Sequence, residues 1–208
     1  MSHPLYDDAG RADVRRNLAR FTVAPLPAGS LKRASVCLIV TDDGAGGCAL
    51  VLTRRARSLN THAGQFALPG GRVNEGESTI EAALREAREE INLALDPDTV
   101  LGTLDDYPTR SGYLITPIVV WAPQDAEMSA SPDEVSRIYH IPVSDLARSG
   151  TPVFYSIPES DRPVIQYPIV NSRVHAPTAA LIYQFMEVAI GGRDTRVAHL
   201  EQPVWAWK

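Results

Sequence analysis

Cysteine is scarce in this chain, which has only two, Cys37 and Cys48, among 208 residues. Each lies in an apolar stretch, and neither has a metal-ligand spacing such as CxxC. We therefore expect two small buried thiols. Because two cysteines cannot cross-link a chain of this length, a reducing cytoplasm is the expected location.

Long hydrophobic runs and an excess of basic charge are missing as well. No stretch approaches the roughly 20 apolar residues that cross a bilayer, and the N-terminal sequence MSHPLYDDAGRADVRR lacks the apolar core of a signal peptide. The chain has 20 Lys and Arg against 25 Asp and Glu, a net charge of −5. Nucleic-acid-binding domains are typically basic. We expect a soluble protein that binds neither membranes nor nucleic acids.

The sequence does contain an alternation of strand and helix patterns. The stretch SVCLIVTDDGAGGCALVLTRR predicts a β-hairpin around a DDGAGG turn. Helical spacing of apolar residues predicts helices, and β-rich runs predict strands. The expected helices are 11–21, 79–92 and 176–192, and the expected strands are 100–108 and 113–123. Residues 136–146 are expected to form a strand that runs into a short helix, and residues 152–174 to form strand and loop.

This order of elements predicts an α+β fold, an α/β/α sandwich with one mixed β-sheet between helices. The length suits one domain. We therefore divide the chain into an N-terminal helix and linker, residues 1–30, and a single domain, residues 31–208. The C-terminal sequence VWAWK is expected to pack on the body of the protein or on a second copy.

Three glutamates, Glu86, Glu89 and Glu90, lie within about 100° of one another on the helix predicted over 79–92. We place them on the face roughly opposite its apolar stripe. Like charges at this spacing destabilise a helix unless a cation offsets them, and hard cations such as Mg²⁺ take oxygen ligands. The alternative is a solvated acidic helix face with interleaved arginines.

The segment 71–93 resembles the Nudix box, G-x5-E-x7-R-E-U-x-E-E-x-G-U, in which U is aliphatic. Chance would match six fixed positions in register about once in 10⁷ starts. Asn92 replaces the second glycine of the box, and Asn tolerates the left-handed conformation that a helix C-terminus often needs. Ala87 stands where a larger aliphatic residue is usual. The matching positions are Gly71, Glu77, Arg85, Glu86, Glu89 and Glu90.

The resemblance implies the Nudix fold and a hydrolase that depends on Mg²⁺, with Mn²⁺ as a possible substitute. It implies that the loop and helix of the box form the catalytic site. Arg85 would orient the carboxylates around the metal. The implied metal ligands are Glu86, Glu89, Glu90 and Gly70.

The residues before the box are similar to a further signature, LLTxR[SA]xxxRxxxGxxxFPGG, of the coenzyme A pyrophosphatase branch. The matches are Leu52, Thr53, Arg55, Ala56, Gly64, Pro69, Gly70 and Gly71. The chain departs from the branch at Val51, Asn60, Leu68 and the run His175-Ala176-Pro177. Since the signature has arginine at position 60, its loss is expected to weaken recognition of an additional phosphate, such as the 3′-phosphate of coenzyme A.

Further residues are candidates for substrate contact or proton transfer. Glu134 matches the glutamate of an EV pair in the branch and is a fourth carboxylate, either a metal ligand or a base, with an exposed loop glutamate as the alternative. Arg54 and Arg55 belong to a basic cluster with Arg57. His62 could contact a phosphate or make only local hydrogen bonds. The candidate substrate-binding residues are Arg54, Arg55, His62, Gly70 and Gly71.

The leading expectation is a pyrophosphatase of coenzyme A or acyl-coenzyme A that releases 3′,5′-ADP and a 4′-phosphopantetheine product. A hydrolase of ADP-ribose or NADH is the enzymatic alternative, and a non-catalytic ligand-sensing domain is the other. The partner is in each case a small nucleotide-derived molecule. The chain is expected to be a monomer or a homodimer.

Overall fold

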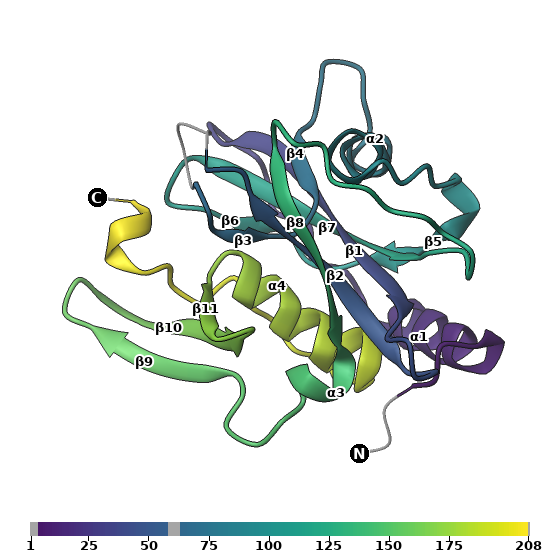
Figure 1. The fold of residues 1–208 in the computed structure, drawn as a ribbon. Coiled ribbons are helices and arrows are strands. Elements are labelled where there is room, and N and C mark those ends of the chain that lie inside the picture. The colour runs from purple at the N-terminus through teal and green to yellow at the C-terminus, as the bar shows by residue number, and fades with distance from the viewer. Residues whose placement is uncertain (1–3, 58–62, 208) are drawn as a thin grey trace.

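The computed structural model describes residues 4–57 and 63–207 (Figure 1). The helices are α1 (Asp8–Arg20), α2 (Thr79–Ile91), α3 (Val143–Leu146) and α4 (Thr178–Gln184), with η1 (Pro97–Thr99), η2 (Phe185–Ile190) and η3 (Val204–Ala206). The strands are β1 (Lys32–Asp42), β2 (Cys48–Arg55), β3 (Phe66–Ala67), β4 (Gly70–Arg72), β5 (Val100–Thr103), β6 (Tyr107–Pro108), β7 (Tyr113–Trp121), β8 (Val135–Pro142), β9 (Val153–Ile157), β10 (Ser160–Ile169) and β11 (Ser172–His175).

The main sheet is mixed and lies between helices, which confirms the expected α/β/α sandwich. Its order is β3-β2-β1-β7-β5, with β4 on β1, β6 on β7 and β8 on β2. Strands β1 and β7 are parallel, and the other pairs are antiparallel. Helix α2 covers one face, and α1, α3 and α4 pack on the other (Figure 1). The buried thiols of Cys37 and Cys48 lie in this sheet, as expected.

The predicted hairpin is present as β1 and β2, which pair from Val40 with Leu50 to Asp42 with Cys48. The turn is stabilised by two carboxylates. Asp42 accepts hydrogen bonds from the backbone N–H groups of residues 44 and 46, and Asp43 from those of residues 45 and 47. Short acidic side chains favour such turns because they satisfy backbone donors that have no strand partner.

Helix α1 begins three residues before the predicted start. The Asp7 side chain accepts a hydrogen bond from the backbone N–H of Gly10 at 2.7 Å and caps the helix. Val14 and Leu18 enter the core on the α4 side of the sheet, whereas the arginines of the helix are mainly exposed. These arginines therefore form a largely solvated face of the helix.

The strands expected in the proline-containing segment 152–174 are present, but β9, β10 and β11 form a separate three-stranded sheet instead of joining one mixed sheet. Consecutive residues of β10 are buried, including Val164, Ile165 and Tyr167, because the strand packs against α4 and the C-terminal segment. The helix predicted over 176–192 begins at Thr178, and its last part, Phe185–Ile190, is π-helical. In the part of the chain that the structure describes, no helix is long and apolar enough to cross a membrane.

Glu201 fixes the C-terminal segment to the rest of the protein. Its carboxylate is 1% exposed, pairs with Arg110 and accepts hydrogen bonds from the Ser160 hydroxyl and the Gln202 backbone. Hydrogen bonding to the Arg110 guanidinium is the largest of the effects that lower the pKa of Glu201 to about 2.

We expect Glu201→Gln to reduce the free energy of unfolding by up to about 3 kcal/mol near pH 6. Because the folded-state pKa lies below the unfolded value of about 4.3, the ionised carboxylate stabilises the fold above pH ~5, and this contribution disappears as the pH falls toward 2. Urea unfolding of both proteins from pH 6 to pH 2.5 should show a difference that shrinks with pH. A constant difference would contradict the assignment, and Glu127→Gln in an exposed loop is the control.

Candidate active site

Helix α2 has well-defined ends that fix the orientation of its carboxylates. Ser78 and Glu81 form a capping box at the N-terminus, in which each side chain bonds to the backbone of the other residue. Asn92 caps the C-terminus with φ 54° and ψ 29°. This left-handed conformation confirms that asparagine can replace the second glycine of the box without disrupting the helix end.

Gly70 and Gly71 bring the backbone of β4 against both β1 and α2. A Cβ atom on Gly71 would lie 2.2 Å from Oε1 of Glu86. On Gly70 it would lie 2.4 Å from the Ser35 carbonyl oxygen and 2.7 Å from the Val36 Cα. Such separations are shorter than van der Waals contact. At Gly70 the obstructing atoms include backbone, so glycine is required there for steric reasons, whereas at Gly71 they belong to the end of the Glu86 side chain.

Arg85 donates hydrogen bonds to three glutamates of the box, Glu77, Glu86 and Glu89. Its guanidinium donates to both carboxylate oxygens of Glu77 at 2.8 and 3.1 Å, and to the Arg72 carbonyl at 3.0 Å. Nη1 donates to Oε1 of Glu86 and Oε2 of Glu89, both at 2.8 Å. All five N–H donors of an arginine are used in this way, so a lysine could not replace Arg85.

Glu90 occupies a different position from the one expected. It was placed on the face opposite the apolar stripe, but only 3% of it is exposed, and it lies beside the apolar residues of α2. The reason is helical geometry: Glu90 follows Ala83 by seven residues, which leaves the two about 20° apart. Glu86 is also largely buried, with 13% of its side chain exposed, whereas Glu89 is 54% exposed.

Burial makes the carboxyl groups of Glu86 and Glu90 weaker acids than usual. It raises the pKa of Glu90 to about 8, and the charges of Glu86 and Glu134 add to this rise. Arg55 opposes it, with Nη1 4.0 Å from Oε1 of Glu90, as does the backbone of Gly70. Burial also raises the pKa of Glu86. These carboxylates therefore have a deficit of positive charge.

A divalent cation would supply the charge that this arrangement lacks. Within residues 4–57 and 63–207, no three acidic, histidine or cysteine side chains are already close enough to chelate an ion. Arg85 instead holds Glu86 and Glu89. The donors are nevertheless hard oxygens, and Mg²⁺ commonly binds through one or two carboxylates while water and substrate phosphates complete its shell. The residues present thus fit a Mg²⁺ or Mn²⁺ ion.

Glu134 lies in the turn before β8, with its side chain exposed. Its backbone carbonyl accepts a hydrogen bond from Ala56 at 2.8 Å, which joins the start of β8 to the end of β2. It is close enough to Glu86 and Glu90 for its charge to raise the pKa of both. The fold therefore brings Glu134, which follows Glu90 by 44 positions in the sequence, near the carboxylates of Glu86 and Glu90.

The basic cluster of β2 is divided between the two faces of the sheet. Arg55 approaches Glu90, and its buried Nε has no hydrogen-bond partner among the described residues. Arg54 donates from Nε to the Gly64 carbonyl at 3.0 Å and lies over the Phe66 ring. His62 and Asn60 fall in the segment 58–62, outside the described residues.

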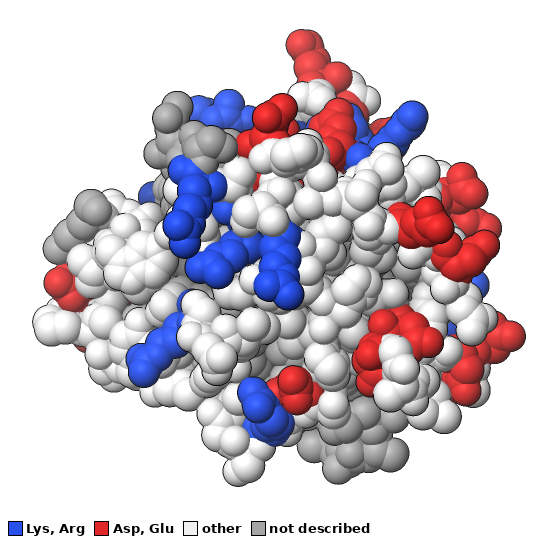
Figure 2. Space-filling view, in the orientation of Figure 1, with Lys and Arg blue, Asp and Glu red and all other residues white. Residues whose placement is uncertain are grey.

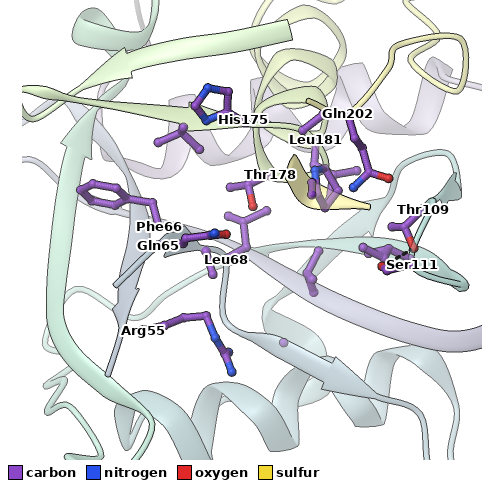
Figure 3. A pocket seen from close by; sticks show the side chains of 18 of the residues that line it. Arg55, Gln65, Phe66, Leu68, Thr109, Ser111, His175, Thr178, Leu181 and Gln202 are labelled. Carbon is purple, nitrogen blue, oxygen red and sulfur yellow. Dashed lines mark hydrogen bonds between the residues drawn. The ribbon is translucent and has the colours of Figure 1, made fainter. Parts of the chain in front are cut away.

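A cavity of about 600 Å³ lies next to the carboxylates, between the main sheet and the unit formed by β11, α4 and the C-terminal segment (Figure 3). In Figure 3, Gln65, Phe66 and Leu68 face His175, Thr178 and Leu181 across it, while Arg55 extends toward α2. Four of the positions where the sequence departs from the coenzyme A pyrophosphatase branch line this cavity: Leu68, His175, Ala176 and Pro177.

Several lining residues were not predicted from the sequence. Trp205 is 53% exposed, and its ring meets His175 edge-on at 5.3 Å. Trp207 packs on the body of the protein, where Arg110 lies 5.2 Å from its ring. The other unpredicted polar residues are Gln65, Thr109, Ser111, Ser172, Arg173, Thr178 and Gln202. They come from distant segments of the chain, and no local pattern marks them.

Comparisons with known proteins give one family. The model of the NUDIX domain matches residues 31–161. The chain is 43% identical over 97 residues to the "Uncharacterized Nudix hydrolase NudL" of Photorhabdus laumondii, which covers 46% of this chain and 52% of that protein. It is 42% identical over 102 residues to the protein of the same name from Escherichia coli O7:K1, covering 49% and 53%. The chain thus spans about half the length of the curated relatives it matches.

Solved structures with related arrangements are more distant. A MutT/nudix family protein from Enterococcus faecalis has a TM-score of 0.47 and 18% identity, with 78% of this chain and 61% of that chain covered. An Ap4A hydrolase from C. elegans has a TM-score of 0.43 and 22% identity, with 55% and 82% covered.

Proposed function

Because the chain belongs to the Nudix family, we propose that it hydrolyses the pyrophosphate bond of a nucleoside diphosphate derivative with the aid of Mg²⁺ or Mn²⁺. The observation that carries this proposal is the buried, charge-deficient pair Glu86 and Glu90 against Gly70 and Gly71, beside a cavity of about 600 Å³. Small-molecule sites have volumes of roughly 300–1,000 Å³. An anionic substrate and its metal ion would fit together where the cavity meets the carboxylates.

Coenzyme A or an acyl-coenzyme A is the proposed substrate. The signature residues Gly64, Pro69 and Gly70 belong to the segment that builds the cavity wall and positions β4. The lining mixes apolar and polar side chains, as suits the pantetheine arm of such a substrate with its amide groups. Hydrolysis would give 3′,5′-ADP and a 4′-phosphopantetheine product.

The residues of the chain divide the proposed work between them. Arg85 orients the carboxylates of Glu86 and Glu89, and Glu90 completes the metal ligands with Glu86, Glu89 and the Gly70 backbone. Arg55 binds substrate phosphate oxygens where the cavity meets the carboxylates. Glu134 accepts the proton of the attacking water. The bound cation supplies charge neutralisation at the phosphate oxygens and makes a nearby water more acidic.

The direct test is hydrolysis of a panel of substrates with Mg²⁺ and with Mn²⁺, followed by mass identification of the products. The panel comprises coenzyme A, an acyl-coenzyme A, ADP-ribose, NADH and a diadenosine polyphosphate. Formation of 3′,5′-ADP from coenzyme A supports the proposed substrate. Cleavage of ADP-ribose alone would contradict the coenzyme A assignment but agree with the proposed pyrophosphate hydrolysis. If none of the substrates is cleaved, both proposals are contradicted.

Particular residues bear on the two alternative functions, an ADP-ribose or NADH hydrolase and a non-catalytic ligand-sensing domain. Leu68 and the His175-Ala176-Pro177 run, which depart from the branch signature, lie in the cavity wall, so an ADP-ribose or NADH hydrolase is the alternative to test. A non-catalytic ligand-sensing domain is disfavoured because the glutamates of the box are all retained. The panel separates these alternatives, since a sensing domain would bind ligand without turnover.

We expect saturating Mg²⁺ or Mn²⁺ to raise the melting temperature by about 5 °C or more. Binding to the native state alone contributes about 2.7 kcal/mol at 100 times Kd, and about 2–4 °C per kcal/mol applies to a chain of this size. Differential scanning fluorimetry with and without EDTA measures the shift. The double variant Glu86→Gln/Glu90→Gln is the control, and it should lose the response. An unchanged melting temperature in the wild type would contradict the metal site.

A further inference from the structure

Two arginines lie side by side on neighbouring strands. Arg54 of β2 and Arg137 of β8 are directly opposite each other in the antiparallel register. Side chains in such a pair have Cβ atoms about 5 Å apart, and like charges at that distance destabilise a sheet. A pair of this kind has a cost in stability that an anion bound between the two guanidinium groups would remove.

Aromatic rings support both guanidinium groups on the α4 face of the sheet. Arg54 lies 5.8 Å from the centre of the Phe66 ring, and Arg137 lies 5.0 Å from that of Tyr139. The two rings are themselves in contact, with centres 5.0 Å apart and planes at 54°. Cation–π contacts hold the arginines in place without neutralising them. The four side chains form a basic platform, defined here as Arg54, Arg137, Phe66 and Tyr139.

Carboxylates do not neutralise this platform. None of the Asp and Glu side chains in the described part of the chain forms an ion pair with Arg54 or Arg137. Figure 2 shows several Lys and Arg side chains gathered on this face near β2 and β8, with acidic side chains next to them toward the top of the molecule. In a chain of net charge −5, such a local concentration of positive charge favours an anionic ligand.

The platform is next to the proposed active site. Phe66 and Gly64 line the cavity, and Arg54 contacts both, lying over the Phe66 ring and donating from Nε to the Gly64 carbonyl at 3.0 Å. Arg55, on the opposite face of β2, also lines the cavity and lies 4.0 Å from Glu90. A substrate whose pyrophosphate lies at the carboxylates could therefore extend a second anionic group toward Arg54 and Arg137. Planar guanidinium groups bind phosphate oxygens in a bidentate manner.

We propose that Arg54 and Arg137 together bind a phosphate monoester of the substrate that is separate from the pyrophosphate being hydrolysed. This inference rests on the proposed function. It assigns to two paired strand residues the recognition that the missing arginine at position 60 would otherwise provide. A nucleotide with a ribose 3′- or 2′-phosphate is the class of ligand that fits.

The test compares coenzyme A with 3′-dephospho-coenzyme A. Arg137→Gln should raise KM for coenzyme A about tenfold more than KM for the dephosphorylated substrate, because a charge-assisted hydrogen bond is lost only with the former. The double variant Arg54→Gln/Arg137→Gln should lose less than the product of the single losses, since both arginines contact one phosphate. Arg20→Gln, an exposed arginine of α1, is the control.

A charge reversal separates binding from stability. Arg137→Glu places opposite charges across the strands, so its melting temperature should equal or exceed that of the wild type, yet its discrimination between the two substrates should disappear. A lower melting temperature with discrimination retained would show a purely structural pair and overturn the proposal. So would an equal KM rise for both substrates, which would place the pair at the hydrolysed pyrophosphate.

Inorganic phosphate provides a readout that does not need turnover. It should raise the melting temperature of the wild type but not of Arg137→Glu, even if none of the panel substrates is hydrolysed. Failure of the proposed function would then appear as absent turnover, and failure of the anion site as equal responses to phosphate. If phosphate stabilises the wild type while KM discrimination is absent in an active enzyme, the site binds free phosphate and the substrate assignment is overturned.

Discussion

Replacing Glu90 with glutamine is expected to reduce kcat by at least ~10²-fold, because one lost carboxylate weakens charge stabilisation at the metal by several kcal/mol. The variant should stay folded. Glutamine has nearly the shape of glutamate, and burial already raises the pKa of Glu90 to about 8, so removing the ionisable group from this buried position does not destabilise the helix. Steady-state kinetics with saturating Mg²⁺, together with a melting curve, measures both effects.

The comparison variants distinguish metal binding from a general effect of lost charge. Glu89→Gln should also lower kcat at least ~10²-fold if Glu89 is a ligand as proposed, although its side chain is 54% exposed and bound to Arg85. Glu75→Gln, in the exposed loop before α2, should leave kcat unchanged. Turnover near the wild-type rate in Glu90→Gln would remove the basis of the metal-site assignment.

The paired glycines should give opposite results when each is changed to alanine. In Gly71→Ala the atoms nearest to the new methyl group belong to the Glu86 carboxylate, at 2.2 Å for Oε1 and 2.5 Å for Cδ. A side-chain end can rotate away, so the melting temperature should change little. The displaced carboxylate should reduce kcat about 10²-fold, the scale of effect expected when a reacting group moves by about 1 Å.

Gly70→Ala differs because the methyl group meets backbone atoms of β1, which cannot rotate away. We expect a loss of about 2–4 kcal/mol in the free energy of unfolding, as for other overpacked sites. Urea unfolding and kinetics of both variants test the contrast. If Gly71→Ala keeps full activity, the Glu86 carboxylate does not need its position against β4, and its proposed role as a ligand fails.

Local sequence determined the framework of this protein. The helical spacing of apolar residues located α2 to within a residue, because its caps, Ser78 and Asn92, are themselves sequence features. The β1–β2 hairpin was equally predictable, since the turn residues Asp42 and Asp43 satisfy backbone donors only a few positions away. The six matched positions of the box also indicated the family, because the carboxylates and Arg85 are close together along one helix and its preceding loop.

Tertiary structure decided which carboxylates are buried and what surrounds them. Helical spacing already put Glu90 beside Ala83 on the apolar side of α2, and packing of this side on the sheet buried Glu90 and left Glu89 exposed. The cavity, the separate β9–β11 sheet and the opposition of Arg54 and Arg137 arise from strand pairings between distant segments. Periodicity identifies a strand, but the partner and register of that strand depend on packing across the whole fold, and this protein's site is built where those pairings meet.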